Sequence, residues 1–234
     1  MCELFCGQGE LTRQCRSNGI DCRGLDLLKN RYHDLTTPEG FMIALTKVLR
    51  IRRSGLFWSG NPCNSWIWIS SSTTRRNADN WGIFGNEDVE CVRLGNQVAA
   101  RWALLALVCT IMNIFWVVEQ PQSSCLRDCP YVSHVLLNLG PPAFFRRMWM
   151  ATFGHWCAKP TQLFGTWPAI EDFDGYLPRK CRLLLSSTGM YMKEIINGKT
   201  RVTGGKRLKS SGAYTKQFGQ KVASLFKKNR GKVT

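Results

Sequence analysis

The sequence predicts an α/β fold in which a central, mostly parallel sheet is flanked by helices. Short apolar segments alternate with stretches of helical spacing between residues 2 and 164, and this alternation is typical of parallel sheets with right-handed crossovers. A Gly-x-Gly turn follows the first apolar segment directly. Polar residues follow several later segments, and ligands of such sheets bind beyond the carboxyl ends of the strands. These observations together indicate a Rossmann-like fold.

The first part of the chain contains the predicted elements of a nucleotide-binding βαβ unit and the strand that follows it. Apolar residues at Phe41, Leu45, Val48 and Leu49 have the spacing of one helix face. The expected elements are a strand over 2–6, a helix over 9–18, a strand over 20–25, a helix over 41–51 and a strand over 55–59.

The middle of the chain is read as a long loop followed by more of the sheet. Residues 64–95 are polar and irregular, and such loops are usually functional or mobile. The apolar run 102–118 is near the shortest length that crosses a bilayer, but Asn113 interrupts it. We therefore expect no membrane span but a buried helix over 96–112 and a strand over 114–118. Later strands are expected over 144–153 and 161–164.

The charge of the chain indicates a polyanionic partner. The net charge is +16 over 234 residues, which favours nucleic acid, although an acidic protein or a membrane surface has the same attraction. Between Lys193 and Thr234 there are twelve Lys or Arg and one acid, Glu194. We therefore divide the chain into a catalytic domain over 1–190 and a basic C-terminal segment over 191–234.

The basic segment also contains an amphipathic pattern. Its apolar residues recur at the spacing of one helix face, so a helix is expected to dock on the rest of the protein. The residues of this face are Tyr214, Phe218, Val222, Leu225 and Phe226.

The cysteines indicate a reducing, intracellular compartment, the nucleus or the cytoplasm. The chain has eleven of them, and its start lacks the basic and apolar regions of a signal peptide. Several lie within apolar segments, so we expect mostly buried free thiols. No CxxC pair is present and the chain has only three His, so no metal site is expected.

The Gly-x-Gly turn is the first candidate site. Gly7 and Gly9 follow a strand and precede a helix, and Asp26 ends the next strand, where an acid can accept from ribose hydroxyls. Asp34 is placed to accept from an adenine amine. The alternatives are a purely structural turn with a surface Asp26, and a helix-terminal or turn role for Asp34.

Two further residues at strand ends can carry chemistry. Cys63 follows Pro62 after an apolar strand and is a candidate nucleophile, with Arg75 and Arg76 as cations that favour its thiolate. Glu119 ends another apolar strand and can donate a proton. The alternatives are an inert thiol and a structural acid.

These motifs together resemble class I S-adenosylmethionine-dependent methyltransferases, and most closely the cytosine-5 DNA methyltransferase family. Residues 3–9, Glu-Leu-Phe-Cys-Gly-Gln-Gly, are similar to the family's Asp-Leu-Phe-x-Gly-x-Gly cofactor motif. Asn61-Pro62-Cys63 is similar to its Pro-Pro-Cys loop, and Val118-Glu119-Gln120 to its Glu-Asn-Val motif. A Tyr214-led segment resembles the last family motif, which returns to the cofactor site. The chain has no room for the family's target-recognition domain.

The resemblance implies an enzyme that binds S-adenosylmethionine and methylates a pyrimidine base in RNA or DNA. Cys63 would add to C6 of the base and Glu119 would hold or protonate N3. The residues implied in cofactor binding are Glu3, Phe5, Cys6, Gly7, Gly9, Asp26, Asp34 and Pro62. Those expected to contact phosphates are Arg75, Arg76, Lys206, Arg207 and Lys209.

Two other functions remain open from the sequence. One is methyl transfer to an amine or a small molecule, with a structural Cys63. The other is a non-catalytic nucleic-acid-binding protein on a degenerate methyltransferase fold.

Overall fold

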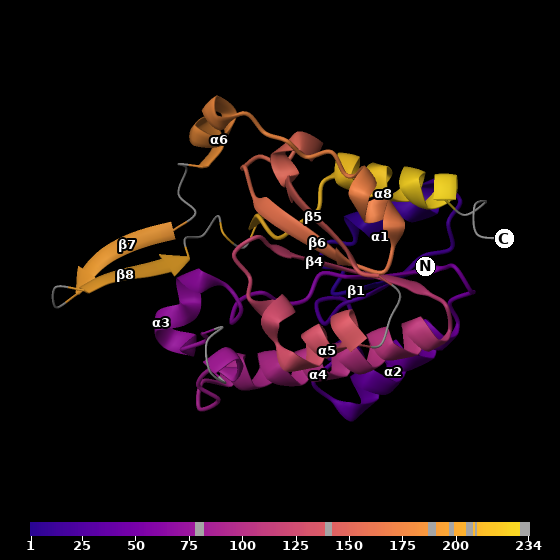
Figure 1. Ribbon diagram of the computed structural model, residues 1–234, viewed down its shortest axis with the longest axis horizontal. Helices are drawn as coiled ribbons and strands as arrows, with labels where there is room; N and C mark the ends of the chain where they lie inside the picture. Colours follow the sequence, from indigo (N-terminus) through magenta and orange to yellow (C-terminus); the bar gives the residue numbers. More distant parts are fainter. Residues whose placement is uncertain are drawn as a thin grey trace.

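The computed structural model describes residues 1–77, 82–138, 142–186, 191–196, 199–204, 208 and 210–229. A six-stranded sheet in the order β2-β1-β3-β4-β6-β5 forms its centre. Helices α1 and α8 cover one face of this sheet, and α2, α4 and α5 cover the other (Figure 1). The predicted α/β class with a mostly parallel sheet is confirmed at this level.

The elements of the sheet and its helices follow the order expected from the sequence. The strands are β1 (Cys2–Leu4), β2 (Arg23–Leu25), β3 (Leu56–Ser59), β4 (Phe115–Pro121), β5 (Phe144–Trp149) and β6 (Pro160–Gly165). The main helices are α1 (Glu10–Ser17), α2 (Pro38–Leu49), α4 (Glu90–Ile111), α5 (Pro130–Asn138) and α8 (Lys216–Asn229). Helix α5 was not among the expected elements.

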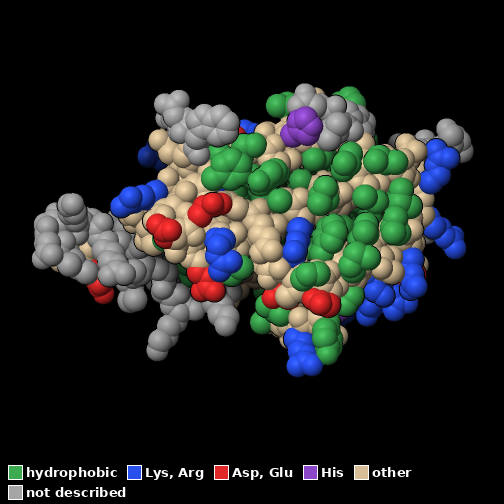
Figure 2. Space-filling view, turned by 90° about the horizontal axis from the view of Figure 1, so that it is seen from below, with side chains coloured by type: hydrophobic (Ala, Val, Ile, Leu, Met, Phe, Trp, Pro, Cys, Tyr) green, Lys and Arg blue, Asp and Glu red, His purple; other side chains and the backbone are tan. Residues whose placement is uncertain are grey.

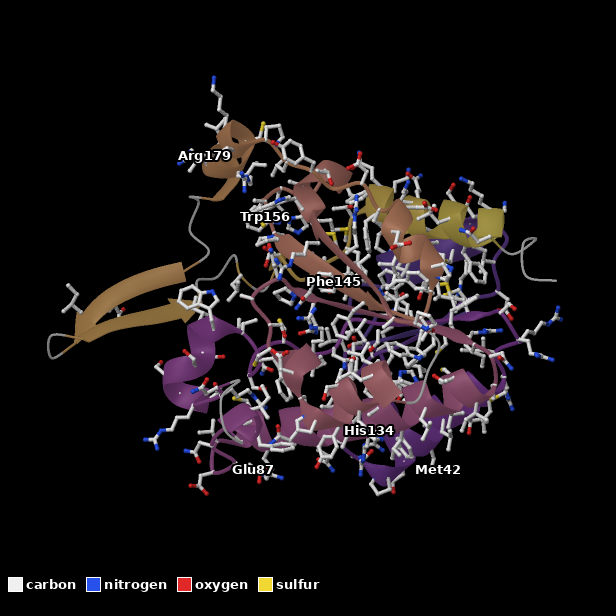
Figure 3. The ribbon with its side chains drawn as sticks, in the orientation of Figure 1. Met42, Glu87, His134, Phe145, Trp156 and Arg179 are labelled. Atoms are coloured by element: carbon white, nitrogen blue, oxygen red, sulfur yellow. The ribbon has the colours of Figure 1, made fainter. Side chains whose placement is uncertain are left out.

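Alternating residues of the strands build two separate cores. In β3, Phe57 packs on the α2–α4–α5 side, whereas Leu56 and Trp58 pack on the α1–α8 side. Successive side chains of a strand point to opposite faces, so a fully apolar strand indicates a sheet covered on both sides. Figure 3 shows His134 and Met42 on the α2–α4–α5 side of the sheet.

Four strands, β2, β1, β3 and β4, are parallel, but β6 pairs antiparallel with both β4 and β5. The direction of β6 was not evident from its apolar pattern, because that pattern has the same form in either orientation. Gly165, at the end of β6, has φ 156 and lies against the backbone of β4. A Cβ added there would stand only 2.0 Å from the carbonyl oxygen of Trp116, so this position requires glycine.

The prediction of a long loop over 64–95 is wrong. This region contains the short turns η2 (Trp68–Ser70) and η3 (Gly82–Phe84), the short helix α3 (Ser71–Thr74) and the first turn of α4. Buried Arg76 holds it together by donating to the Ser65 and Ile83 carbonyls and to Asn96 Oδ1. A buried polar residue with several hydrogen-bond partners produces no apolar periodicity, so the sequence pattern did not indicate this structure.

The run 102–118 is divided as expected between a helix, α4, and a strand, β4. By length and composition alone, α4 could cross a membrane. Val92, Trp102 and Cys109 of this helix are nonetheless completely buried within the protein, as in a core helix. Exposed apolar side chains, including Met42, Leu104, Ile111 and Leu137, are found on α2, α4 and α5, and Figure 2 shows an apolar face on this side of the molecule.

The C-terminal region combines one confirmed element with three that were not expected. Helix α8 packs on α1 through its apolar face, and Gly219 permits the close approach because a Cβ there would lie 2.9 Å from Gln14 Cγ. The unexpected elements are α6 (Arg179–Ser186) and the antiparallel hairpin of β7 (Tyr191–Ile196) and β8 (Lys199–Gly204), which projects from the body (Figure 1).

Candidate functional site

The strand order places a crevice between the carboxyl ends of β1 and β3. From β1 the chain passes to β2 on one side and returns to β3 on the other, with α1 and α4 on opposite faces. In open α/β sheets, ligands bind where the order reverses in this way. The residues that follow β1 and β3 are Phe5–Gly9 and Gly60–Cys63, the two segments that the sequence singles out.

The turn after β1 is tightly wound. Phe5, Gly7 and Gly9 all have positive φ, at 59, 50 and 73 respectively. A left-handed conformation is easy for glycine but strained for phenylalanine, and such strain gathers at ligand sites. The Cys6 N–H donates to Leu25 O, and Gly9 is the N-cap of α1. The N–H groups of Cys6, Gly7 and Gly9 are all bonded within the protein, to Leu25 O, the Asp26 carboxylate and Cys6 O, so the turn is held rigidly beside the crevice.

Asp26 connects the first two strand ends. Its two carboxylate oxygens accept from the Gly7 N–H at 2.7 Å and the Leu28 N–H at 2.8 Å. An ionised carboxylate has about four acceptor positions, so Asp26 retains capacity for a ligand hydroxyl. The His33 ring lies against the Asp26 backbone, with Nδ1 3.2 Å from the carbonyl oxygen. The Asp26 carboxylate is thus held in place before any ligand arrives.

A cavity of about 540 Å³ opens at this crevice. Four of the predicted cofactor residues line it, namely Phe5, Asp26, Asp34 and Pro62. Its other walls come from His33, Leu35, Gly60 and the first turns of α4, including Cys91, Leu94 and Val98. The volume lies within the range of small-molecule sites.

The Asp34 side chain also stabilises the turn that contains it. Its Oδ1 accepts from the Thr36 N–H at 2.9 Å and from the Thr36 hydroxyl at 2.7 Å. The turn role considered as an alternative is therefore present, in a residue that still lines the cavity.

Glu3 is completely buried in β1 next to the cofactor turn. Its Oε2 accepts from the backbone N–H and the hydroxyl of Thr12, while Oε1 is buried with no hydrogen-bond partner in the described part of the chain. Burial raises the pKa of Glu3 to about 7, against the opposing effect of the Thr12 hydrogen bonds. An orphaned buried carboxylate oxygen beside Lys29 and Asp26 is unusual in a purely structural position.

Cys63 and Glu119 belong to a neighbouring cluster at the ends of β3 and β4. Glu119 Oε1 lies 3.7 Å from Lys159 Nζ, and both side chains are largely buried. The Tyr214 hydroxyl donates to Glu119 Oε2 at 3.3 Å and accepts from Trp58 Nε1 at 3.1 Å. Glu119 and Lys159 both influence the Cys63 thiol electrostatically. The described lining of the 540 Å³ cavity includes Pro62 but not this cluster.

The loop that carries Cys63 is anchored to β4. Gln120 Nε2 donates to the Asn61 carbonyl at 2.6 Å, and the Asn61 side chain is bonded to the Ser59 hydroxyl. Asn61 Nδ2 is buried without a partner among the described residues. Gln120 follows Glu119 directly, so one strand positions both the acid and the thiol loop.

The resting state of Cys63 is the thiol. Burial and the nearby Glu119 carboxylate raise its pKa to about 11, and Lys159 opposes them. The cation beside this thiol is thus Lys159, and the expectation that Arg76 serves Cys63 is wrong. Arg76 is enclosed by Ser65, Asn96 and the Trp66 ring, with its guanidinium 3.4 Å from the ring centre.

The predicted phosphate contacts have different outcomes. Buried Arg76 uses its guanidinium within the protein, which argues against the phosphate role expected for it. Arg75 is exposed, at a backbone position with φ 52. Lys206, Arg207 and Lys209 lie outside the described residues.

Sequence reasoning missed two residues of the site, His33 and Lys159. His33 was counted only as a possible zinc ligand, although its position between Asp26 and Asp34 was a usable signal. Lys159 stands between apolar Cys157-Ala158 and a strand. A lysine at such a strand border is an ordinary surface residue unless the sheet order brings an acid beside it.

All eleven cysteines are free, and seven of them are buried, which confirms mostly buried thiols. Within the described residues, no group of three or more His, Cys, Asp or Glu is arranged to hold a metal ion. No family model matches this chain, and no curated protein matches it.

Proposed function

We propose that the protein is an S-adenosylmethionine-dependent methyltransferase that modifies C5 of a pyrimidine base in nucleic acid. The observation that carries the proposal is the 540 Å³ cavity at the strand-order reversal, lined by Phe5, Asp26, Asp34 and Pro62. Asp26 and Asp34 were selected from the βαβ pattern, and Phe5 and Pro62 from the motif resemblance. The structure brings them to one cavity, as the meeting of parallel strand ends at one edge of the sheet leads one to expect.

The residues present fit the cofactor. Asp26 offers a held carboxylate for ribose hydroxyls, and the Phe5 ring lines the cavity where an adenine could pack. Glu3 is completely buried next to the glycine turn and does not line the cavity, so its carboxyl group supports the turn from behind. When bound, S-adenosylmethionine supplies an electrophilic methyl group.

The chain's residues would then prepare the base. Cys63 Sγ bonds to C6 as its thiol proton passes to water, and Glu119 holds or donates a proton at N3, which makes C5 nucleophilic. After C5 is methylated, the C5 proton passes to water and the Cys63–C6 bond breaks, which restores the ring, releases Cys63 as a thiolate and returns to Glu119 any proton that it donated. Lys159 favours the thiolate and balances the charge of Glu119. A base within a duplex would have to be flipped out first.

A second candidate is methyl transfer to an amine or a small molecule, with Cys63 as a structural thiol. It is favoured by the raised pKa of Cys63, because an attacking cysteine ordinarily has a lowered pKa. A non-catalytic nucleic-acid-binding protein would lack cofactor affinity, so cofactor binding separates it from both enzymes.

The first test is calorimetry with S-adenosylmethionine. We expect saturable binding, weakened about 10- to 100-fold by Asp26→Asn, because loss of a hydrogen bond to a charged group costs roughly 1.5–3 kcal/mol. The matched control is Asp21→Asn, an exposed acid before the same strand. Absence of binding by the unmodified protein would refute the proposal.

The second test is trapping on RNA and DNA oligonucleotides that contain 5-fluorocytosine, where fluorine at C5 prevents release of the enzyme. We expect a covalent adduct that depends on S-adenosylmethionine, disappears in Cys63→Ala and persists in Cys181→Ala, an exposed cysteine outside the cluster. Cofactor binding without an adduct would favour the second candidate.

A further inference from the structure

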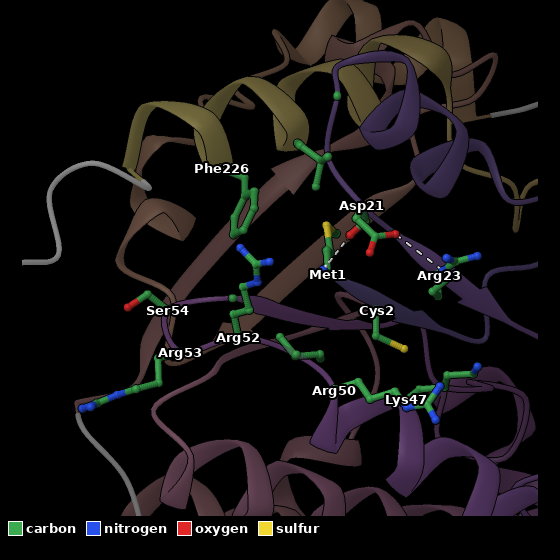
Figure 4. Close-up of a pocket in the computed structure, with 14 residues that line it drawn as sticks. Met1, Cys2, Asp21, Arg23, Lys47, Arg50, Arg52, Arg53, Ser54 and Phe226 are labelled. Atoms are coloured by element: carbon green, nitrogen blue, oxygen red, sulfur yellow. Dashed lines mark hydrogen bonds and ion pairs between the residues drawn. The ribbon is translucent and has the colours of Figure 1, made fainter.

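A second cavity lies at the opposite end of the parallel strands from the candidate site. Its volume is about 1020 Å³, and it opens beside the amino ends of β1 and β3, next to Phe226 of α8 (Figure 4). The candidate cofactor residues follow the carboxyl ends of the same strands. The length of these strands therefore separates the two cavities, which share no lining residue.

The lining of this cavity is strongly basic. Five cations border it, four of them exposed and Lys47 half-buried, and Asp21 is the one acid of its lining, paired with Arg23 at 3.5 Å. The cations are Arg23, Lys47, Arg50, Arg52 and Arg53. Lys47 and Arg50 stand at the C-terminal end of α2, where the helix dipole alone favours positive charge. That explanation does not extend to Arg52, Arg53 and Arg23, which lie outside the helix.

The turn that presents the arginines is held firmly. Ile51 is buried in the core, the Ser54 N–H donates to Asn113 O at 2.8 Å, and the Gly55 N–H donates to Arg52 O at 2.9 Å. Ser54 adopts φ 57 to make this turn. A fixed backbone reduces the backbone entropy lost on binding, so only the arginine side chains would have to become ordered around a ligand.

We infer that this cavity, the basic pocket of residues 47–53 with Arg23, binds phosphate groups of a nucleic-acid strand. Arginine binds phosphate through paired N–H groups, and four of the five cations are arginines. A concave pocket can enclose the backbone of a nucleic-acid strand, whereas a membrane surface is flat and would not fill it. The inference does not rest on methyl transfer, because the pocket shares no residue with the candidate cofactor site.

The test compares two triple variants that remove equal charge. Arg50→Gln/Arg52→Gln/Arg53→Gln alters the pocket, and Arg127→Gln/Lys180→Gln/Lys216→Gln removes three exposed cations elsewhere. Binding of a fluorescent 20-nucleotide single-stranded RNA is measured by anisotropy over a salt series. Each phosphate contact contributes about 0.7 to the slope of log affinity against log salt. We expect the pocket variant to lose about 2 from this slope and the control to keep the wild-type value.

Several outcomes would overturn the inference. These are an unchanged slope in the pocket variant, equal losses in both variants, or displacement of the RNA by poly-glutamate at equal charge. If the pocket variant loses only tripolyphosphate binding, the pocket takes a small phosphate ligand and the nucleic-acid assignment fails. Thermal melting verifies that both variants fold. Calorimetry with S-adenosylmethionine is run in parallel, so failure of the proposed enzyme function is distinguishable from failure of this pocket.

Discussion

Glu3 offers a direct test of the energetics at the cofactor turn. Its carboxyl group is completely buried and its pKa is raised to about 7, from an ordinary value near 4.5. The folded protein therefore binds this proton more tightly than the unfolded chain does. Between those two pH values the folded state carries more protons, so its stability must fall as the pH rises.

The magnitude follows from the size of the shift. A change of one pKa unit corresponds to about 1.4 kcal/mol, so the shift at Glu3 corresponds to about 3 kcal/mol. This penalty is absent below pH 4.5 and fully present above pH 7. Glu3→Gln removes the titration while Gln Oε1 can still accept from the Thr12 N–H.

Urea denaturation at pH 5 and pH 8 measures the effect. Between the two pH values, we expect the unmodified protein to lose about 2–3 kcal/mol more unfolding free energy than Glu3→Gln. The difference between the proteins cancels the contributions of all other titrating groups. Glu39→Gln, an exposed carboxylate on α2, is the matched control. Equal pH dependence in the unmodified protein and Glu3→Gln would show that the carboxyl is not desolvated as argued.

Three further predictions concern the cores and the thiol. Phe218→Ala should lower the free energy of unfolding by about 3–5 kcal/mol in urea denaturation, because this buried ring packs among four other aromatic rings. A loss below about 1 kcal/mol would contradict the docking of α8. Arg76→Met should lower the free energy of unfolding by about 2–4 kcal/mol in the same assay, since it leaves buried acceptors at Ser65 and Asn96 without a donor. An unchanged free energy of unfolding would mean that Arg76 does not hold this region together. Alkylation of Cys63, followed by peptide mass spectrometry, should accelerate up to about pH 11; a rate that levels off below pH 8 would mean an activated thiolate.

The sequence predicted the central elements because their patterns are local. The Phe57-containing strand, the α4–β4 pair and the amphipathic α8 each show the spacing of their own secondary structure. The residues after β1, β2 and β3 were also identified as a group, since the carboxyl ends of parallel strands meet at one edge. Phe5, Asp26 and Pro62 do line one cavity, as this reasoning expects.

Other features were missed because they depend on polar contacts between distant segments. The fold of residues 64–95 depends on Arg76, whose partners at Ser65 and Asn96 are 11 and 20 residues away. Nothing in the composition of that stretch distinguishes a buried guanidinium from an exposed one. The assignment of Arg76 to phosphate binding failed for the same reason.

The sequence by itself therefore determined the α/β class, the strand ends at which the candidate site stands, and the positive charge of the protein. Only the tertiary structure decided which cation meets Glu119, that Tyr214 reaches the same carboxylate, and that the arginines of residues 50–53 border a second cavity. The physical reason is the sequence distance over which the deciding interactions act. Secondary structure follows from the spacing of neighbouring residues, whereas the surroundings of a side chain depend on strand order, which brings Lys159 and Tyr214 to Glu119 from 40 and 95 residues away.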